Sequence, residues 1–490
     1  MIQTPEWVRD AVFYQIFPDR FAKSPTLNKP SNLEPWDSPP TSHGFKGGDL
    51  IGVVEHLDHL LELGVNAIYF CPVFQSAANH RYHTYDYFNV DPLLGGNQAL
   101  RVLLDEAHRR GMRVILDGVF NHASRGFFQF HDILENGRHS PYIDWFTVRS
   151  LPLNAYDERT PPNYDAWWSL HALPKFNTSN ADVREYLMRV GEFWVQFGID
   201  GWRLDVPAEI NDDSFWQEFR TRVKAINPDT YIVGEIWHEA RRWLQGDQFD
   251  AVMNYLFTKL CIEFFIGRNV DPALVEGSSL APLRHIEAAE FGREIDALLK
   301  LYSREITEVQ MNLLDSHDTA RYLTMARGDQ TALRLATLFQ MAYPGAPSVY
   351  YADEIGMAGG RDPLSRASFP WDRSTWDTDL LDFFKRAIAL RHTHPALRRG
   401  DYHTLFAQGS VYVMSRSLGQ DVVVVAFNTG NEPLAGAIPV APFLQNGMQL
   451  RDEWTGQTLQ VEGGLLSLSM PARSGSVLTS TGAMPGGVTG

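Results

Sequence analysis

The chain has 490 residues, of which 44% are hydrophobic and 21% are charged, and its formal net charge is −16 at pH 7. This length is enough for a large core and two or three domains. The negative charge argues against nucleic acid and against an anionic membrane surface as partners, because both attract clustered Lys and Arg. Cys71 and Cys261 stand in unrelated contexts, which argues against a structural zinc site or a disulfide framework.

The N-terminal stretch MIQTPEWVRDAVF has neither the basic start nor the apolar run of a signal peptide. No run of 18 apolar residues occurs, so the sequence predicts no membrane span. We therefore expect a cytoplasmic protein. The 13 Trp, 18 Tyr and 29 Phe mostly suit core packing, and the remainder suit stacking on flat apolar ligands such as sugar faces.

Three junctions along the chain share one pattern: LLELG-VNAIYF, AHRRG-MRVILD and WVQFG-IDGWRLD. Each is an amphipathic helix, then a glycine (Gly64, Gly111 or Gly198), then an apolar run rich in β-formers. Glycine suits the left-handed position that ends a helix. Near-continuous apolar strands that alternate with helices predict a parallel sheet covered on both faces.

Eight such strands are expected, and a doubly wound sheet is disfavoured because VFYQIFPDRF carries no Gly-rich phosphate turn. The predicted fold is therefore a (β/α)8 barrel, with a loop subdomain inserted after the third strand and a C-terminal antiparallel β-sandwich domain. The expected strands are at about 11–17, 67–73, 113–119, 201–206, 231–236, 251–255, 309–314 and 348–352. The expected domains are the barrel (1–121 and 178–398), the inserted subdomain (122–177), the β domain (399–482) and a disordered tail (483–490).

Polar side chains gather where the predicted strands end, which is where a barrel places its active site. The strand ends read DGVFNH (117–122), GWRLD (201–205), VGEIWH (233–238) and LLDSHD (313–318). A single carboxylate at such a place is more often an ion pair or a helix cap. Several carboxylates with His and Arg at one barrel mouth are difficult to explain as structure alone. The polar side chains at these strand ends are Asp117, Asn121, His122, Arg203, Asp205, Glu235, His317 and Asp318.

Two carboxyl groups that act on one bond are the requirement of glycoside hydrolysis. One must be ionised and the other protonated, so their surroundings must differ. Arg203, on the same strand face as Asp205, is expected to keep Asp205 charged, whereas Ile236 and Trp237 are expected to desolvate Glu235 and raise its pKa. No Ser or Cys stands beside a base, no HExxH occurs, and the His56/His59 pair is expected to be solvated on an amphipathic helix.

The four strand-end motifs, with GIDGWRLDV and LLDSHDTAR in full, resemble those of the α-amylase family of glycoside hydrolases over nearly the whole chain. Within that family the chain is most similar to the cyclomaltodextrinase, neopullulanase and maltogenic amylase group. The stretches that carry this closer resemblance are HALPKFNT (171–178), GEIWHEARRWLQGDQFDAVMNY (234–255) and NHRYHTYDYFNVDPLLG (79–95).

The resemblance implies a retaining mechanism with Asp205 as nucleophile and Glu235 as acid/base, their carboxyl groups about 5–5.5 Å apart. It implies that Asp318 binds sugar hydroxyls and stabilises the oxocarbenium-like transition state. The expected substrate-binding residues are Tyr82 stacked on the sugar, His122 and His317 hydrogen-bonded to it, Arg203 orienting Asp205, and Asp117, Glu209, Trp237 and Arg321.

The chain departs from the group's pattern in three places. It is expected to lack the group's N-terminal β domain, which leaves the oligomeric state open. VPAEI follows the nucleophile where the group has Ala-Asn-Glu, so Pro207 and Ala208 differ near the leaving-group side while Glu209 is kept. No cofactor is expected to be required. Calcium stays possible at Asn121 and at the turn with Gly47 and Asp49, although the loop AKSPTLNKPSN is poor in carboxylates.

The leading hypothesis is a hydrolase of α-1,4 links in maltooligosaccharides, with cyclodextrins or pullulan as further candidates and glycosyl transfer as a side activity. One alternative is an α-glucosidase or a trehalose synthase-like enzyme acting on small disaccharides. Another is a binding protein that keeps the barrel without chemistry, which the presence of Asp205, Glu235 and Asp318 disfavours. The sequence leaves open exo against endo action, α-1,6 cleavage and chain-length preference.

Overall fold

The computed structural model describes residues 2–481, so the tail predicted for 483–490 lies outside the described residues. Eight parallel strands form one sheet in the order β8-β7-β6-β5-β2-β1-β10-β9. A parallel bridge between Met253 and Met311 joins the two ends of this order and closes the barrel. The strands are β1 (Phe13–Ile16), β2 (Ala67–Phe70), β5 (Arg113–Gly118), β6 (Gly201–Leu204), β7 (Tyr231–Gly234), β8 (Ala251–Val252), β9 (Met311–Leu313) and β10 (Ala346–Tyr350).

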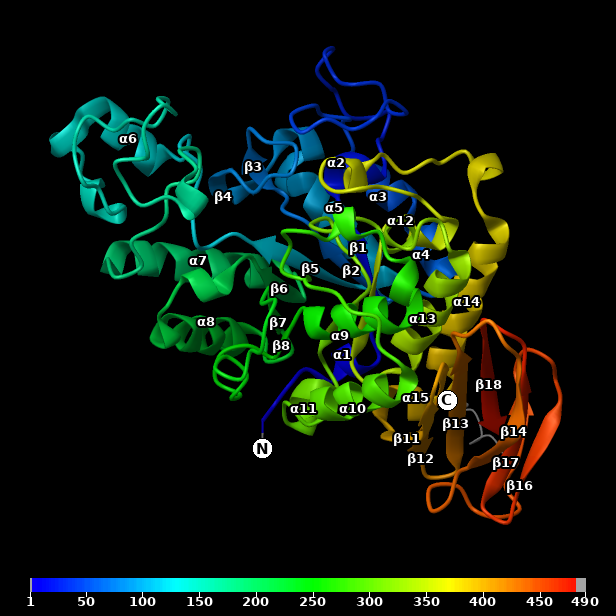
Figure 1. Cartoon of the computed structure of the whole chain (residues 1–490). Coiled ribbons are helices and arrows are strands. Elements are labelled where there is room, and N and C mark those ends of the chain that lie inside the picture. The colour runs from blue at the N-terminus through cyan, green and yellow to red at the C-terminus, as the bar shows by residue number, and fades with distance from the viewer. Residues whose placement is uncertain (1, 482–490) are drawn as a thin grey trace.

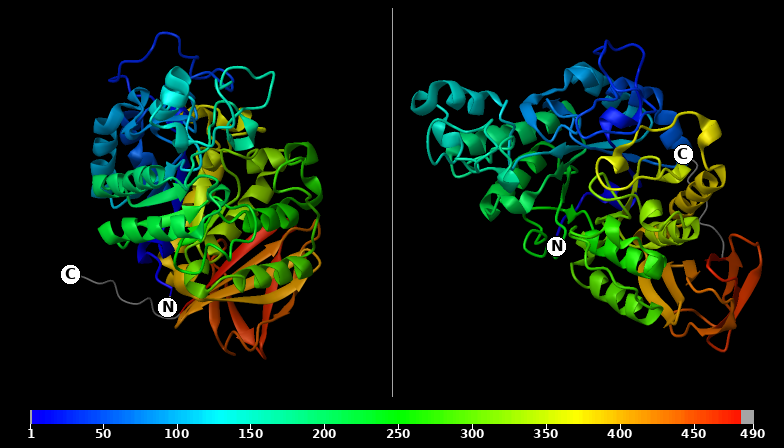
Figure 2. Two further views of the ribbon diagram at one scale, coloured as in Figure 1. Left: turned by 90° about the vertical axis from the view of Figure 1, so that its left-hand side faces the viewer. Right: turned by 45° about the horizontal axis from the view of Figure 1, so that its top comes forward.

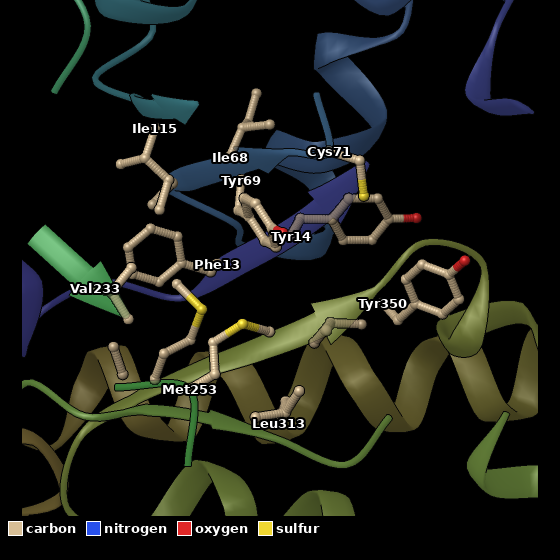
Figure 3. Close-up of a cluster of buried hydrophobic side chains, with 14 of the residues drawn as sticks. Phe13, Tyr14, Ile68, Tyr69, Cys71, Ile115, Val233, Met253, Leu313 and Tyr350 are labelled. Carbon is tan, nitrogen blue, oxygen red and sulfur yellow. The ribbon is translucent and has the colours of Figure 1, made fainter. Parts of the chain in front are cut away.

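The barrel strands lie where they are predicted, and the (β/α)8 fold is confirmed. Gly64, Gly111 and Gly198 all have positive φ at helix ends, as the three junctions predict. Side chains of different strands, among them Phe13, Tyr69, Ile115, Val233 and Met253, gather in the barrel and are fully or almost fully buried (Figure 3). The helices that cover the strands are mainly α3 (Leu50–Glu55), α4 (Leu57–Leu63), α5 (Gly96–Arg109), α7 (Ala181–Phe197), α8 (Asp213–Ile226), α10 (Ala288–Leu299), α13 (Gln330–Ala342) and α14 (Thr378–Thr393).

Two excursions leave the regular barrel on the side where the strands end. The first is the β3–β4 pair (Phe74–Ser76 and Thr84–Val90), which the strand prediction missed and whose connecting loop carries Tyr82. The second is the segment between β5 and α7, which contains α6 (Phe128–Asn136) and several short 3-10 turns. This inserted segment and the C-terminal domain lie on opposite sides of the barrel (Figures 1 and 2).

The C-terminal strands pair in the order β11-β12-β13-β18-β15-β16-β17-β14. Alternate residues of β12 and β13 face two different cores. Val413 and Val424 belong to a core inside the domain, whereas Tyr412 and Phe427 join the barrel core. The strands are β11 (Asp401–Gln408), β12 (Val411–Leu418), β13 (Asp421–Asn428), β14 (Leu434–Pro439), β15 (Gln449–Asp452), β16 (Thr458–Glu462), β17 (Leu465–Met470) and β18 (Ser474–Ser480).

Phe291 on α10 and Phe339 on α13 contact these inward-facing aromatic rings. The ring centroids of Phe291 and Tyr412 are 5.0 Å apart, and those of Phe339 and Phe427 are 5.8 Å apart. The domain junction is therefore part of a continuous aromatic core. No helix among residues 2–481 combines the length and the apolar character that crossing a membrane needs.

Candidate active site

Arg203 occupies the centre of the site, on β6 at the end of the barrel where the strands finish. Its side chain has no exposed surface. Nη1 donates to both carboxylate oxygens of Asp117 at 3.0 Å and to Oδ1 of Asp205 at 3.1 Å. Nη2 lies 3.0 Å from Oε2 of Glu235. One guanidinium therefore brings together three carboxyl groups from three consecutive barrel strands.

Glu235 follows β7 and receives further donors on the same side of the barrel. The indole Nε1–H of Trp237 donates to Oε1 at 2.9 Å, and the backbone N–H of Val206 donates to Oε2 at 3.0 Å. Val206, directly after Asp205, has φ 35° and ψ 49°. A β-branched residue in the left-handed region is strained, and such strain concentrates at functional sites. Here the strained backbone points an N–H at Glu235.

The surroundings of Asp205 shift the pKa of its carboxyl group in opposite directions. Burial raises the pKa of the Asp205 carboxyl well above its usual value, Glu235 raises it further, and Arg203 lowers it. Arg203 is shared among three carboxyl groups, and burial is the largest influence on the pKa of Asp205.

Tyr82, His317 and Asp117 form a hydrogen-bonded chain across the site. The Tyr82 hydroxyl donates to Oδ2 of Asp117 at 2.9 Å and lies 2.6 Å from Nε2 of His317. The Gln15 amide lies 2.7 Å from the other ring nitrogen of His317, and burial lowers the pKa of this histidine well below its usual value. With Gln15 donating to Nδ1, the neutral ring carries its proton on Nε2.

Asp117 itself is fully buried beneath this chain. Tyr69 also donates to it, at 2.8 Å, and burial raises its pKa to about 6. Because Asp117 has no exposed surface, it does not line the site directly. The prediction that Asp117 binds substrate therefore needs correction: its carboxylate instead accepts hydrogen bonds from Tyr69, Tyr82 and Arg203.

Asp318 is the most exposed of the three predicted catalytic carboxyl groups, with 31% of its side chain accessible. Its Oδ2 lies 3.2 Å from His317 Nε2, and its Oδ1 lies 3.4 Å from Nη2 of Arg366. Arg366 also donates from Nε to the backbone carbonyl of His317 at 2.9 Å. The sequence interpretation missed Arg366, since it lies in an irregular loop after β10 in a stretch, SRASFP, without a motif.

His122 closes the site on the side of the inserted segment. Burial lowers its pKa to about 3, so the ring is neutral. Its Nε2 is buried and has no hydrogen-bond partner among the described residues. The ring stacks on Trp167 of the insertion, with centroids 5.3 Å apart. An unpaired buried ring nitrogen is suited to a hydroxyl group of a ligand.

Of the other predicted substrate-binding residues, Arg321 faces away from this group of side chains, and Glu209 lies at the surface beside the insertion. Arg321 is fully buried, donates to the carbonyl of Tyr351 and to Asp353 at 2.7 and 2.8 Å, and packs on two tyrosine rings, so it stabilises the loop after β10. Glu209 is exposed and forms an ion pair with Lys175 of the insertion at 2.9 Å. The expectation that His56 and His59 are both solvated is wrong, because His59 is buried and bonds Glu354 at 2.8 Å.

The residues at the possible calcium turn do not fit a calcium ion. Asp49 accepts from the backbone N–H groups of Gly52 and Ser24 at 2.7 and 3.0 Å, and the Lys29 ammonium lies 3.1 Å from its Oδ2. Asn121 keeps one buried unpartnered oxygen. However, residues 2–481 contain no group of three His, Cys, Asp or Glu side chains that could hold a metal ion. We propose that Lys29 neutralises Asp49 in place of a metal cation.

Replacing Lys29 with Met tests this proposal, because Met keeps the apolar stem and removes the ammonium. We expect a loss of about 1–3 kcal/mol of unfolding free energy, since a buried carboxylate loses its charged partner. Differential scanning calorimetry measures the change, and the exposed Lys23→Met on the same loop is the control. A large rise in the wild-type melting temperature on adding calcium, reversed by a chelator, would contradict the proposal.

Comparison with known proteins agrees with this geometry. The alpha amylase catalytic-domain model matches residues 15–378, and the neopullulanase-like C-terminal domain model matches residues 402–478. The chain belongs to the alpha-amylase family. It is a glycoside hydrolase of that family, and the predicted similarity to the cyclomaltodextrinase and neopullulanase group is confirmed.

Individual members of the alpha-amylase family match most of the chain. A cyclomaltodextrinase of a Bacillus species is 48% identical over 432 residues, which are 87% of this chain and 74% of that protein. Neopullulanase 2 of Thermoactinomyces vulgaris is 42% identical over 480 residues, 97% of this chain and 78% of that protein. The debranching enzyme from Nostoc punctiforme superimposes with a TM-score of 0.89 at 51% identity, covering 98% of this chain and 99% of that structure.

Proposed function

We propose that the protein is a retaining α-glucan hydrolase that cleaves α-1,4-glucosidic bonds in maltooligosaccharides, with glycosyl transfer as a side activity. The observation that carries the proposal is the contact of Asp205 and Glu235 with the two terminal nitrogens of one guanidinium. This contact supports the assignment of Asp205 as nucleophile and Glu235 as proton donor, because both carboxyl groups face the same guanidinium. Relatives named cyclomaltodextrinase and neopullulanase extend the candidate substrates to cyclodextrins and pullulan.

In the proposed reaction the Asp205 carboxylate attacks the anomeric carbon while Glu235 gives its proton to the departing glycosidic oxygen. This reaction requires Glu235 to carry the proton and Asp205, which faces Arg203, to be charged. The covalent glycosyl-Asp205 ester is next hydrolysed by a water molecule whose proton returns to Glu235. Neutral His122 and His317, together with Asp318, bind the sugar hydroxyls, and the Tyr82 ring stacks on the sugar.

The products released from defined substrates test the proposed specificity. We expect maltotriose to give maltose and glucose, with the α-anomer formed first because two inversions restore the configuration. From pullulan, α-1,4 cleavage gives panose-type trisaccharides, whereas α-1,6 cleavage gives maltotriose. Time-resolved NMR and chromatography of the products measure both outcomes.

Other product patterns point to other enzymes. Trehalose from maltose with little glucose would indicate the trehalose synthase-like alternative, and initial release of β-anomers would exclude a retaining reaction. Maltotriose from pullulan would assign α-1,6 specificity, the reaction that the name of the Nostoc debranching enzyme describes. Each of these results would contradict the proposed α-1,4 retaining hydrolase.

A further inference from the structure

Three aromatic rings form a single stack that leads outward from the active site. His122 and Trp167 lie nearly parallel, with an interplanar angle of 15°. Trp168 stacks on Trp167 with centroids 4.4 Å apart and an angle of 11°. Trp168 is 77% exposed, so the face turned away from Trp167 is open to solvent. The stack thus connects a ring of the active site with the surface of the insertion.

The backbone at Trp168 is strained and held in place. Trp168 has φ 49° and ψ 26°, and Ser169 has φ 58°. The left-handed region is a rare place for a bulky aromatic residue and costs about 1–3 kcal/mol. A bridge between Ala166 and Pro174 and the 3.0 Å bond from Trp167 N–H to the Leu173 carbonyl fix both sides of the turn. A large apolar ring held toward solvent by strained backbone is suited to binding the flat apolar face of a ligand.

We propose that the open face of Trp168 is a stacking platform for a glucose unit of a long α-glucan chain whose reacting end lies at Asp205 and Glu235. This inference rests on the proposed function. The apolar C–H face of a pyranose ring matches an indole face, and the stack is continuous with the active site. Trp168 and the neighbouring Leu170, which is 46% exposed, offer too little area for a stable protein interface, which buries about 1,200–2,000 Å².

The test is Trp168→Ala with the enzyme otherwise complete. We expect the ratio of kcat/KM for maltoheptaose to that for maltotriose to fall about fivefold to tenfold, as for the loss of one aromatic stacking partner. Trp168→Phe restores most of the ratio because it restores a flat ring. Phe128→Ala is the matched control, since Phe128 is a 64% exposed aromatic residue of the same insertion outside the stack, and it keeps the wild-type ratio.

An unchanged ratio in Trp168→Ala overturns the platform, and so does a change of oligomeric state in analytical ultracentrifugation, which assigns the ring to a contact between copies. Failure of the proposed function gives a different result, because wild-type enzyme then cleaves neither oligosaccharide. Binding is read separately by affinity electrophoresis of Asp205→Asn in soluble starch. The platform predicts retardation that a second substitution, Trp168→Ala, removes.

Discussion

Asp205→Asn and Glu235→Gln should each reduce kcat on maltotriose by about 10⁴-fold or more, the scale seen when a residue of a cooperating catalytic group is removed. Asn cannot form the glycosyl ester, and Gln cannot deliver a proton to the glycosidic oxygen. A substrate such as maltosyl fluoride distinguishes the activities of the two variants, because its leaving group departs without protonation. Glu235→Gln then recovers much of its rate of glycosyl-ester formation, whereas Asp205→Asn stays inactive.

Folding and charge need their own control in this experiment. Glu239→Gln removes an exposed carboxylate four residues after Glu235 on the same loop and is expected to keep wild-type activity. Circular dichroism of all variants should match the wild-type spectrum. Substantial activity of Asp205→Asn on either substrate, or equal recovery of both variants with the fluoride, would show that the assigned roles are wrong.

Arg203→Met is expected to destabilise the fold by about 3–5 kcal/mol at neutral pH, because three buried carboxyl groups lose their shared cation. Arg203 lowers the pKa of Asp117 and of Asp205, so these pKa values rise further in the variant. A carboxyl group whose pKa is raised by folding loses stability as the pH rises from its unfolded value through its folded value. The loss of unfolding free energy in Arg203→Met, relative to wild type, should therefore be smaller at about pH 5 than at about pH 8.

Urea denaturation at both pH values measures the deficit. Arg203→Lys keeps the charge but not the planar fork, so it should lie between wild type and Arg203→Met. Arg159→Met is the surface control, because Arg159 pairs with Asp157 on side chains that are 88% and 39% exposed, and so exposed an ion pair contributes little to stability. A deficit that grows at low pH would contradict the shared-cation interpretation.

The fold could be predicted because apolar strands and helix-ending glycines repeat with little ambiguity. GIDGWRLDV shows the limit of the same reasoning. Period-two alternation places Arg203 and Asp205 on one strand face, and they do meet. Alternation gives no information about depth, and Asp117 on β5 lies at the bottom of the site instead of at its surface. The β3–β4 pair was missed because β3 has only three residues, the pairing of the two strands is irregular and both are only partly buried.

The residues of the candidate site also divide into those that the sequence predicts and those that only the folded structure reveals. Residues that follow a barrel strand directly, such as Asp205 and Glu235, are recognisable because the strand fixes where they point. Arg366 reaches Asp318 across 48 residues of chain, and only the folded loop brings them together. Trp167 reaches His122 in a comparable way, through the bridge between His122 and Lys175. Arg321, close in sequence to Asp318, turns instead toward Tyr351 and Asp353.

The aromatic core shared by α10, α13 and the C-terminal strands has a consequence for engineering. A truncation before β11 would expose Phe291 and Phe339 on a wide hydrophobic surface. A catalytic fragment shortened in this way should therefore aggregate instead of being active without the C-terminal domain. Chimeras built from relatives must therefore exchange this sheet together with the helices it covers. Recombination points belong in loops that leave those rings with their native neighbours.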